Sequence, residues 1–158
     1  DQLKDQSAIQ IIEYKDQYKN KFRELNYEWI TRSFTVEKSD EYVLSNPKKA
    51  VIEKGGYIYF AKYNNQIIGT FALVKVDGET FEIAKMGVTE KYQKLGIGQK
   101  LLDHAFQRAK TMKLKRLILY SNTLLAPAIN LYFKNGFRVI PKTDLHNTRA
   151  NIKMERIF

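Results

Sequence analysis

The chain has 158 residues, of which 44% are apolar and 28% are charged, and its formal net charge is +10. This composition is typical of a globular protein that can bury a hydrophobic core, and we expect residues 1–158 to form a single domain. The absence of cysteine excludes disulfides, thiolate ligands and a cysteine nucleophile, and two histidines, His104 and His146, are too few for a zinc site. No apolar run could cross a bilayer and no signal-peptide pattern opens the chain, so we expect a cytoplasmic protein without a metal or a membrane partner.

The first part of the chain predicts one strand followed by two helices. The strand is expected over Ala8–Tyr14. Apolar residues at helical spacing then predict a helix from Asp16 to about Phe34, with Asp16 as its N-cap. A second helical stretch follows Ser39 and is broken by Pro47.

The middle of the chain predicts an antiparallel meander. Tyr57–Tyr63 and Gln66–Val76 are predicted to form a hairpin, and Asn64–Asn65 supplies its turn. Asp77–Gly78 marks the next turn, which leads into a strand over Phe81–Val88.

The last part of the chain alternates between helices and strands. An apolar stripe predicts a helix over Leu95–Lys113, and the strand that follows, Arg116–Tyr120, is expected to lie parallel to the Phe81 strand because a helix connects them. Pro127 opens a further helix, which ends before Gly136, the residue expected to adopt the left-handed conformation. The closing strands are expected over Phe137–Pro141 and Asn151–Phe158.

A glycine-containing loop between a strand and a helix predicts an anion site. The pattern is Gln93-x-x-Gly96-x-Gly98, and the helix that follows would present unpaired N–H groups and the positive end of its dipole. A dinucleotide fingerprint would need a glycine where Leu101 stands, and the spacing of a phosphate-binding P-loop is absent. The loop is therefore expected to bind an anion in a way that differs from both the dinucleotide fingerprint and the P-loop.

Two motifs give this chain a family resemblance. The loop resembles the Q/R-x-x-G-x-G/A motif with which the GCN5-related N-acetyltransferases, the GNAT superfamily, hold the pyrophosphate of acetyl-coenzyme A. The stretch Asn122–Phe137 resembles the second cofactor segment of the family, which ends A-x-x-L-Y-x-x-x-G-F, here from Ala128 onward. The order of predicted elements also matches. The resemblance implies an α/β (α+β) GNAT fold, with a mixed central sheet of about six to seven strands, about four flanking helices and splayed parallel central strands.

The resemblance implies acetyl-CoA as a co-substrate and assigns residues to it. The pantetheine arm is expected to pair with the strand backbone around Gly87, and the pyrophosphate with the amides of the loop. Asn130 lies roughly 200° from Tyr132 around the helix axis, so a surface position is the alternative to a coenzyme contact. The residues expected to bind the coenzyme are Met86, Gly87, Val88, Gln93, Lys94, Leu95, Gly96, Ile97, Gly98, Gln99, Asn122 and Asn130.

Two catalytic residues follow from the same resemblance. Tyr132 matches the family tyrosine that protonates the departing thiolate, with a ring packed in the core as the alternative. Glu82 corresponds to the glutamate that acts as general base in the histone-type branch, with ordered water as the alternative. The backbone N–H of Val88 is the expected oxyanion donor. Alternation along the strand places Glu82, Ala84 and Met86 on one face and Ile83 and Lys85 on the other.

The charge distribution and the residues of the first two predicted helices do not identify the acceptor. Eight basic residues and one acidic residue lie between Lys91 and Arg116, which fits a polyphosphate ligand, a nucleic acid or a solvated helix face. The acidic residues Glu37, Asp40 and Glu41 either attract a cationic amine or pair with a helix dipole. The single tryptophan, Trp29, fits the apolar stripe of its helix and is expected in the core.

We therefore expect an N-acetyltransferase that moves an acetyl group directly from acetyl-CoA to a primary amine in a ternary complex. The acceptor is a small molecule or a peptide, a homodimer is one possible assembly, and a nucleic-acid partner is not expected. Two alternatives stay open: an acyltransferase with another acyl donor or a hydroxyl acceptor, and a catalytically silent module that binds coenzyme A or nucleic acid.

Overall fold

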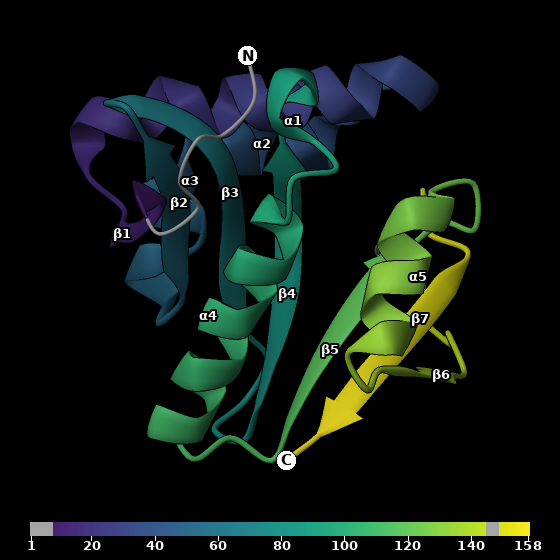
Figure 1. Ribbon diagram of the computed structural model, residues 1–158. Helices are drawn as coiled ribbons and strands as arrows, with labels where there is room; N and C mark the ends of the chain where they lie inside the picture. The colour runs from purple at the N-terminus through teal and green to yellow at the C-terminus, as the bar shows by residue number, and fades with distance from the viewer. Residues whose placement is uncertain (1–7, 145–148) are drawn as a thin grey trace.

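The computed structural model of this protein describes residues 8–144 and 149–158, so His146 lies outside the described residues. Seven strands form one mixed sheet in the order β1-β2-β3-β4-β5-β7-β6 (Figure 1). The strands are β1 (Gln10–Glu13), β2 (Tyr57–Tyr63), β3 (Gln66–Lys75), β4 (Thr80–Val88), β5 (Arg116–Ser121), β6 (Arg138–Ile140) and β7 (Ile152–Ile157). Only β4 and β5 are parallel neighbours; the other pairs among these strands are antiparallel. The predicted mixed sheet is confirmed.

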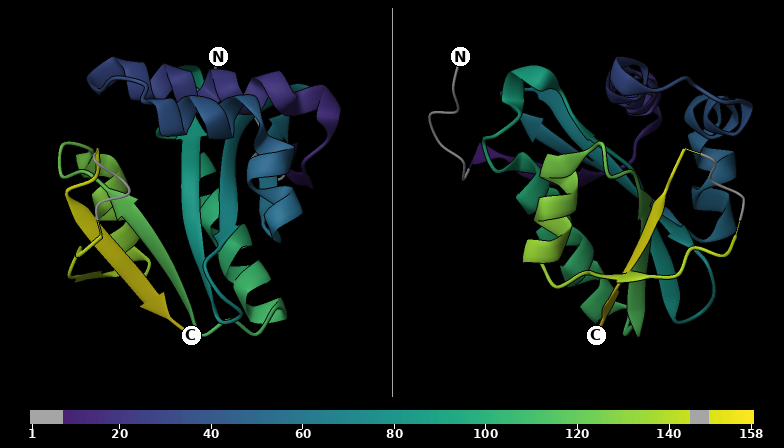
Figure 2. Two further views of the ribbon diagram at one scale, coloured as in Figure 1. Left: turned by 180° about the vertical axis from the view of Figure 1, so that it is seen from behind. Right: turned by 90° about the vertical axis from the view of Figure 1, so that its right-hand side faces the viewer.

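Helices cover both faces of this sheet. The described α-helices are α1 (Lys19–Ser33), α2 (Lys38–Ser45), α3 (Pro47–Ala50), α4 (Ile97–Thr111) and α5 (Ala126–Lys134). The first three lie on one face, and α4 and α5 lie on the other (Figure 2). Short 3₁₀ turns precede α1 (Asp16–Tyr18), follow α3 (Ile52–Lys54) and follow β4 (Glu90–Tyr92). The sheet is thus the middle of three layers.

Each face of the sheet carries its own hydrophobic core. Beneath α4 and α5, the predicted stripe of α4 is buried against the sheet, with Leu101 and Ala105 fully covered. Beneath α1 to α3, Phe22 and Leu44 pack against the opposite face. Neighbouring residues of β3 alternate between the two cores, as the period of two along a strand requires.

Turn chemistry fixes several connections as predicted. Asn64 and Asn65 have φ of 49° and 60°, which a type I′ hairpin turn needs, and asparagine tolerates this left-handed region. Gly136 has φ of 88° directly after α5 and the C-cap Asn135. The predicted hairpin and the predicted glycine after the helix are both confirmed.

The predicted starts of the first two helices are wrong by a few residues. Asp16 lies in a 3₁₀ turn and caps nothing with its side chain, and α1 begins only at Lys19. In contrast, α2 begins at Lys38, before the predicted start, because Glu37 and Asp40 form a reciprocal capping box. The N–H of Glu37 donates to Asp40 Oδ2 at 2.9 Å, and the Glu37 side chain accepts from the backbone of Asp40.

Part of the basic charge between residues 91 and 116 stabilises the fold. Arg108 donates to the Tyr59 hydroxyl at 2.9 Å, and Arg116 donates to Glu155 at 2.8 Å. These two residues are therefore occupied within the protein. Among residues 8–144 and 149–158, no helix is long and apolar enough to cross a membrane, and no group of three or more His, Asp or Glu residues could hold a metal ion.

Candidate active site

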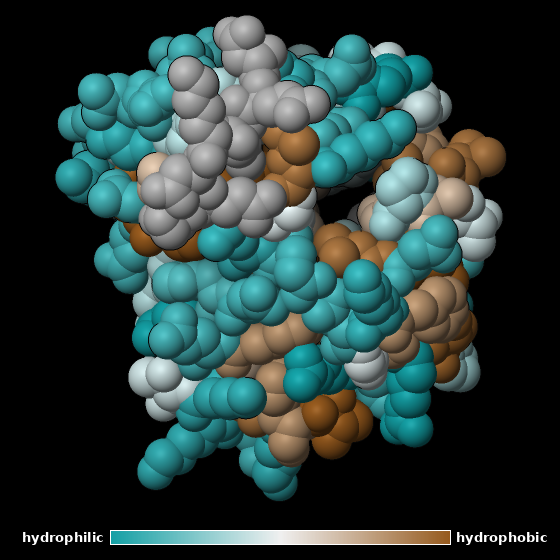
Figure 3. All heavy atoms as spheres, viewed as in Figure 1, coloured by the Kyte–Doolittle hydropathy of each residue, from teal (hydrophilic) through white to brown (hydrophobic). Residues whose placement is uncertain are grey.

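The parallel strands β4 and β5 separate before they end. Their pairing runs from Thr80–Arg116 to Ile83–Leu119, although β4 continues to Val88 and β5 to Ser121. Among the described strands, none covers the β5-facing edge of β4 beyond this point. A cavity of about 940 Å³ lies here, and the surface is hollowed between α5 and the loop before α4 (Figure 3). The predicted splaying of the central strands is confirmed.

A bulge distorts β4 where it lines the cavity. Ala84 is paired with Ala72 and Gly87 with Thr70, so two residues of β4 lie opposite one residue of β3. Lys85, one of these two, has φ of 54°. This left-handed conformation is uncommon for a residue with a long side chain, and such outliers gather at functional sites.

The bulge reverses the alternation of side chains along β4. Glu82 and Ala84 lie opposite residues that belong to the core beneath α1 to α3, whereas Met86 packs against the core beneath α4. Lys85 reaches Asp40 of α2 and so does not share the face of Ile83. The prediction that Met86 lies on the same face as Glu82 is therefore wrong, because one extra residue shifts the period of two.

Helix α1 approaches β4 closely beside the cavity, and glycine at position 87 permits this approach. A Cβ on Gly87 would lie 2.7 Å from Trp29 Cδ1 and 3.3 Å from the Leu25 carbonyl oxygen. Any larger residue would push α1 away from the strand. The close packing places Trp29 at the wall of the cavity.

The first turn of α4 forms another wall of the cavity. Gly96 is the N-cap with φ of 82°, and the N–H of Lys100 makes the first helical hydrogen bond to its carbonyl, at 3.1 Å. The preceding amides of the turn have no partner within the helix, and the helix dipole makes this end positive. Gln93 Nε2 donates to the Val88 carbonyl at 3.0 Å and ties the loop to the end of β4. This end of the cavity suits an anion.

The residues predicted to bind the coenzyme line this one cavity, with two exceptions. Leu95 packs against the core beneath α4, and Asn130 is exposed on α5; neither lines the cavity. The other predicted residues along its wall are Met86, Gly87, Val88, Gln93, Lys94, Gly96, Ile97, Gly98, Gln99 and Asn122.

Two of these side chains already hold parts of the protein together. Gln99 and Asn135 exchange two hydrogen bonds of 2.8 Å, which join the start of α4 to the end of α5. Asn122 donates to the Arg149 carbonyl at 2.8 Å and accepts from the N–H of Leu124 at 2.9 Å. Their side chains therefore shape the wall of the cavity.

Glu82 lines the cavity from the face that α1 to α3 cover. Burial raises the pKa of Glu82 to about 7, while the positive charge of Lys85 acts in the opposite direction. Asp144 raises this pKa further and Lys153 lowers it. A carboxyl group that titrates near neutral pH can accept a proton and release it again, which suits a general base.

Tyr132 lines the cavity from the other face of the sheet, where α5 lies. Its ring packs edge-on against Phe137 with 5.8 Å between the ring centroids. Burial raises the pKa of Tyr132 to about 12, so the phenol stays protonated at neutral pH. The ring of Tyr132 is packed in the core and also borders the cavity. This position is compatible both with a packing role and with a role as proton donor to the thiolate.

Comparison with known proteins identifies the family. Residues 23–137 match the sequence model of the acetyltransferase (GNAT) family, and this range includes the bulged strand, the loop before α4 and the whole of α5. The chain belongs to the GNAT family.

Solved GNAT structures share this fold. An acetyltransferase of the GNAT family from Staphylococcus aureus Mu50 has a TM-score of 0.87 and 28% sequence identity, over 95% of this chain and 99% of its own. A GNAT family acetyltransferase from Elizabethkingia anophelis, with acetyl-CoA bound, has a TM-score of 0.63 and 27% identity, over 97% and 100%.

A relative from Bacillus subtilis (strain 168), the uncharacterized N-acetyltransferase YvbK, is 28% identical over 103 residues. The match includes 63% of this chain and 66% of YvbK, so the chain covers just under two thirds of that relative's length.

The acidic residues of α2 are engaged within this GNAT protein. Asp40 pairs with Lys85 and Arg149, and Glu41 accepts hydrogen bonds from Arg23 at 3.4 Å and from Ser45 at 2.8 Å. The hypothesis that these carboxylates attract a cationic amine is therefore wrong for Asp40, whose oxygens are occupied, and it stays a prediction for the partly exposed Glu41. The spacing of three residues between Glu37 and Asp40 was the available signal, because it is the spacing of a capping box.

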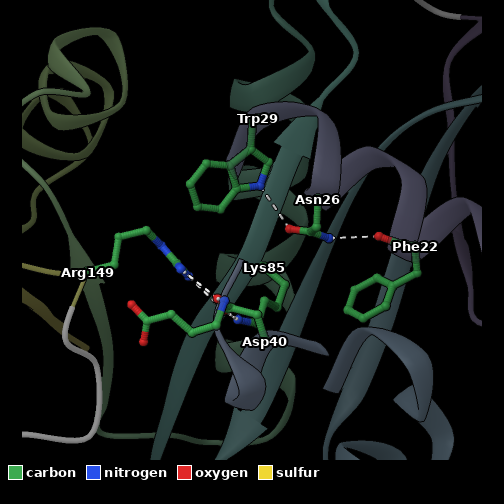
Figure 4. A network of polar contacts seen from close by, with 7 residues as sticks. Phe22, Asn26, Trp29, Asp40, Lys85 and Arg149 are labelled. Carbon is green, nitrogen blue, oxygen red and sulfur yellow. Dashed lines mark hydrogen bonds and ion pairs between the residues drawn. The ribbon is translucent and has the colours of Figure 1, made fainter. Parts of the chain in front are cut away.

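Trp29 lies only partly in the core. It packs against the core beneath α1 to α3 and also lines the cavity. Its Nε1 donates to Asn26 Oδ1 at 2.9 Å, and Asn26 in turn donates to the Phe22 carbonyl (Figure 4). The guanidinium of Arg149 lies 5.6 Å from the ring centroid of Trp29. Sequence reasoning missed Arg149, since its partner Asp40 is 109 residues away along the chain.

Proposed function

We propose that this chain is an acetyl-CoA-dependent N-acetyltransferase that transfers the acetyl group directly to a primary amine. The observation that carries the proposal is the shared cavity: the open edge of β4, the first turn of α4, Glu82 and Tyr132 all line it. The acetyl-CoA bound to the Elizabethkingia anophelis relative supports the choice of donor.

The donor fits along two walls of the cavity. The uncovered edge of β4 beyond Ile83 offers backbone groups to the amides of the pantetheine arm, as an added strand would use them. The amides at the start of α4 offer hydrogen bonds to the pyrophosphate, and Lys94 adds positive charge to the same wall. The donor thus enters between β4 and β5.

Glu82 removes the proton that prevents the amine from attacking. An alkyl ammonium group has a pKa of about 10.4, so few molecules are neutral at pH 7. The carboxylate of Glu82, with its pKa of about 7, accepts this proton directly or through a water molecule, and the nitrogen lone pair is freed to attack the thioester carbonyl. The nitrogen then loses a second proton to solvent, and the carbon–sulfur bond breaks to leave the acetylated amine and coenzyme A.

Tyr132 donates a proton or a hydrogen bond to the departing sulfur. A phenol with a pKa of about 12 is protonated throughout the working range. An exposed thiol has a lower pKa of about 8.5, but burial in the same cavity disfavours a thiolate as it disfavours a phenolate. Burial therefore raises the pKa of the thiol as well, which makes the departing sulfur a better acceptor for the proton or the hydrogen bond of Tyr132.

A thiol-release assay tests this function. With acetyl-CoA as donor, we expect free coenzyme A to appear at a rate that depends on the concentration of an added primary amine, with the acetylated amine detected by mass spectrometry. Release that depends on an alcohol and not on any amine would move the activity to hydroxyl acceptors. An absence of amine-dependent thiol release would contradict the proposal.

A further inference from the structure

Three charged side chains from distant segments meet at one end of the cavity. Asp40 comes from α2, Lys85 from the bulge of β4 and Arg149 from the segment before β7 (Figure 4). Lys85 Nζ lies 2.7 Å from Asp40 Oδ1, and Arg149 binds both carboxylate oxygens at 2.7 and 2.8 Å. All three line the cavity that Glu82 also lines. We call the part around this cluster the acceptor end.

The carboxylate in this cluster has no capacity left for a further cation. Asp40 Oδ1 accepts from Lys85 and Arg149, and Oδ2 accepts from Arg149 and from the N–H of Glu37. These four hydrogen bonds fill the roughly four lone-pair sites of a carboxylate. Burial alone would raise the pKa of Asp40, but the hydrogen bonds from Arg149 and Lys85 hold this pKa well below its ordinary value. Asp40 therefore stays ionised and fully occupied.

The two cations, in contrast, have hydrogen-bond donors to spare. An ammonium group carries three N–H bonds and a guanidinium carries five, and Asp40 takes one from Lys85 and two from Arg149. Within residues 8–144 and 149–158, neither side chain has a second hydrogen-bond acceptor. Glu37, which also acts on Arg149, already accepts from the start of α2. Asp40 therefore has no free hydrogen-bond acceptor, whereas Lys85 and Arg149 retain several hydrogen-bond donors.

Apart from Glu37 and Ser39 at the start of α2, the residues that line the cavity around the cluster are mainly apolar. Phe34, Val43, Val51 and Val74 line it, together with the partly buried ring of Trp29. An acceptor with a second ammonium group would meet two cations and an occupied carboxylate there. An acceptor with a carboxylate would meet free N–H donors of opposite charge, and charge-assisted hydrogen bonds of this kind are the strong ones.

We propose that the acceptor is a primary amine that also carries a carboxylate and an apolar body, as an amino acid does. Lys85 and Arg149 bind the carboxylate, the apolar walls hold the body, and the amine lies toward Glu82. This inference rests on the proposed acetyltransferase function. It names the class of acceptor that the acceptor end selects.

Pairs of acceptors with and without the carboxylate test this inference in the unmodified protein. Each kcat/KM is calculated for the neutral amine, because the carboxylate also changes the pKa of the amine beside it. Suitable pairs are leucine with leucinamide, phenylalanine with phenylalaninamide, and lysine with 1,5-diaminopentane. With acetyl-CoA as donor, we expect kcat/KM for the carboxylate member of a pair to be higher by about tenfold or more, as expected for charge-assisted hydrogen bonds. Equal or reversed values would overturn the inference, whatever the variants show.

A variant pair ties the preference to the cluster. Lys85→Met should reduce the ratio of the two kcat/KM values to about twofold or threefold, while Lys110→Met, on the exposed face of α4, should leave the ratio as it was. Calorimetric titration with acetyl-CoA shows whether each variant is folded. A preference that survives in folded Lys85→Met would overturn the assignment.

The two proposals fail in different ways. If amines release coenzyme A but carboxylate and amide acceptors react equally, only the acceptor class is wrong. If no amine of either kind releases coenzyme A, the acetyltransferase proposal is wrong and the acceptor class falls with it.

Discussion

Glu82 owes its chemistry to its surroundings. Burial raises its pKa to about 7, whereas an exposed glutamate titrates near its ordinary value of 4.5. As a base it works only when ionised, so kcat/KM of the protein should rise with pH through about 7. We expect Glu82→Gln to lower kcat/KM by at least about tenfold and to remove this step from the pH profile. If ordered water alone is the base, the variant will keep both the rate and the step.

The same pKa makes a prediction about stability. Between pH 4.5 and about 7 the folded protein keeps the proton on Glu82 while the unfolded chain has lost it, so this residue destabilises the fold as the pH rises. Replacement by glutamine removes the titration. Between pH 5 and pH 8, the free energy of unfolding of Glu82→Gln should therefore fall by about 2 kcal/mol less than that of the unmodified protein. Urea unfolding at the two pH values measures this; parallel changes would show that Glu82 has an ordinary pKa.

The ring of Tyr132 packs in the core, and its hydroxyl group stays protonated at neutral pH. Tyr132→Phe keeps the ring contact with Phe137 and removes only the hydroxyl. We expect kcat to fall by about tenfold to a hundredfold, with a change of less than about 1 kcal/mol in the free energy of unfolding. Steady-state rates and urea unfolding on the same preparation separate these effects. A rate equal to that of the unmodified protein would mean that Tyr132 only packs.

Among the elements, the contact between α1 and β4 depends on a missing side chain. Gly87→Ala would place a Cβ 2.7 Å from Trp29 Cδ1, so α1 or the indole must shift. We expect the free energy of unfolding to decrease by about 1–3 kcal/mol. Gly78→Ala is the matched control, because nothing lies within 4 Å of a Cβ there, and its effect should stay within about 0.5 kcal/mol. Equal effects of the two substitutions in urea unfolding would contradict the packing.

Local sequence patterns predicted the parts of these elements that local physics decides. The Asn64–Asn65 turn, Gly136 after α5 and the parallel pairing of β5 with β4 are all confirmed. The bulge at Lys85 could not be predicted, since alternation assumes a regular strand and nothing in the residues near Lys85 marks an extra one. The Asp40–Arg149 pair was equally hidden, because it depends on how distant segments come together.

At the scale of the whole molecule, the cavity lies between two parts of the structure that share one core beneath α4 and α5. One part contains β1 to β4 with α1 to α4, and the other contains β5 to β7 with α5 (Figure 1). Four paired positions of β4 and β5 connect them through the sheet. On one face of the sheet the Gln99–Asn135 hydrogen bonds and the Phe106–Phe137 contact join them, and on the other the Asp40–Arg149 pair does. A ligand between the strands would contact both parts. We therefore expect acetyl-CoA binding to depend on the start of α4.

The affinity of Gly98→Asp for acetyl-CoA tests this placement most directly. A carboxylate in the first turn of α4 interacts favourably with the helix dipole, and its Cβ meets only the flexible end of Leu131 at 3.3 Å, so the fold should persist. The same carboxylate would repel a pyrophosphate bound there. By isothermal titration calorimetry, we expect the Kd for acetyl-CoA to rise by at least about tenfold, which is about 1.4 kcal/mol, and Gly78→Asp to bind like the unmodified protein. An unchanged Kd in folded Gly98→Asp would contradict the account.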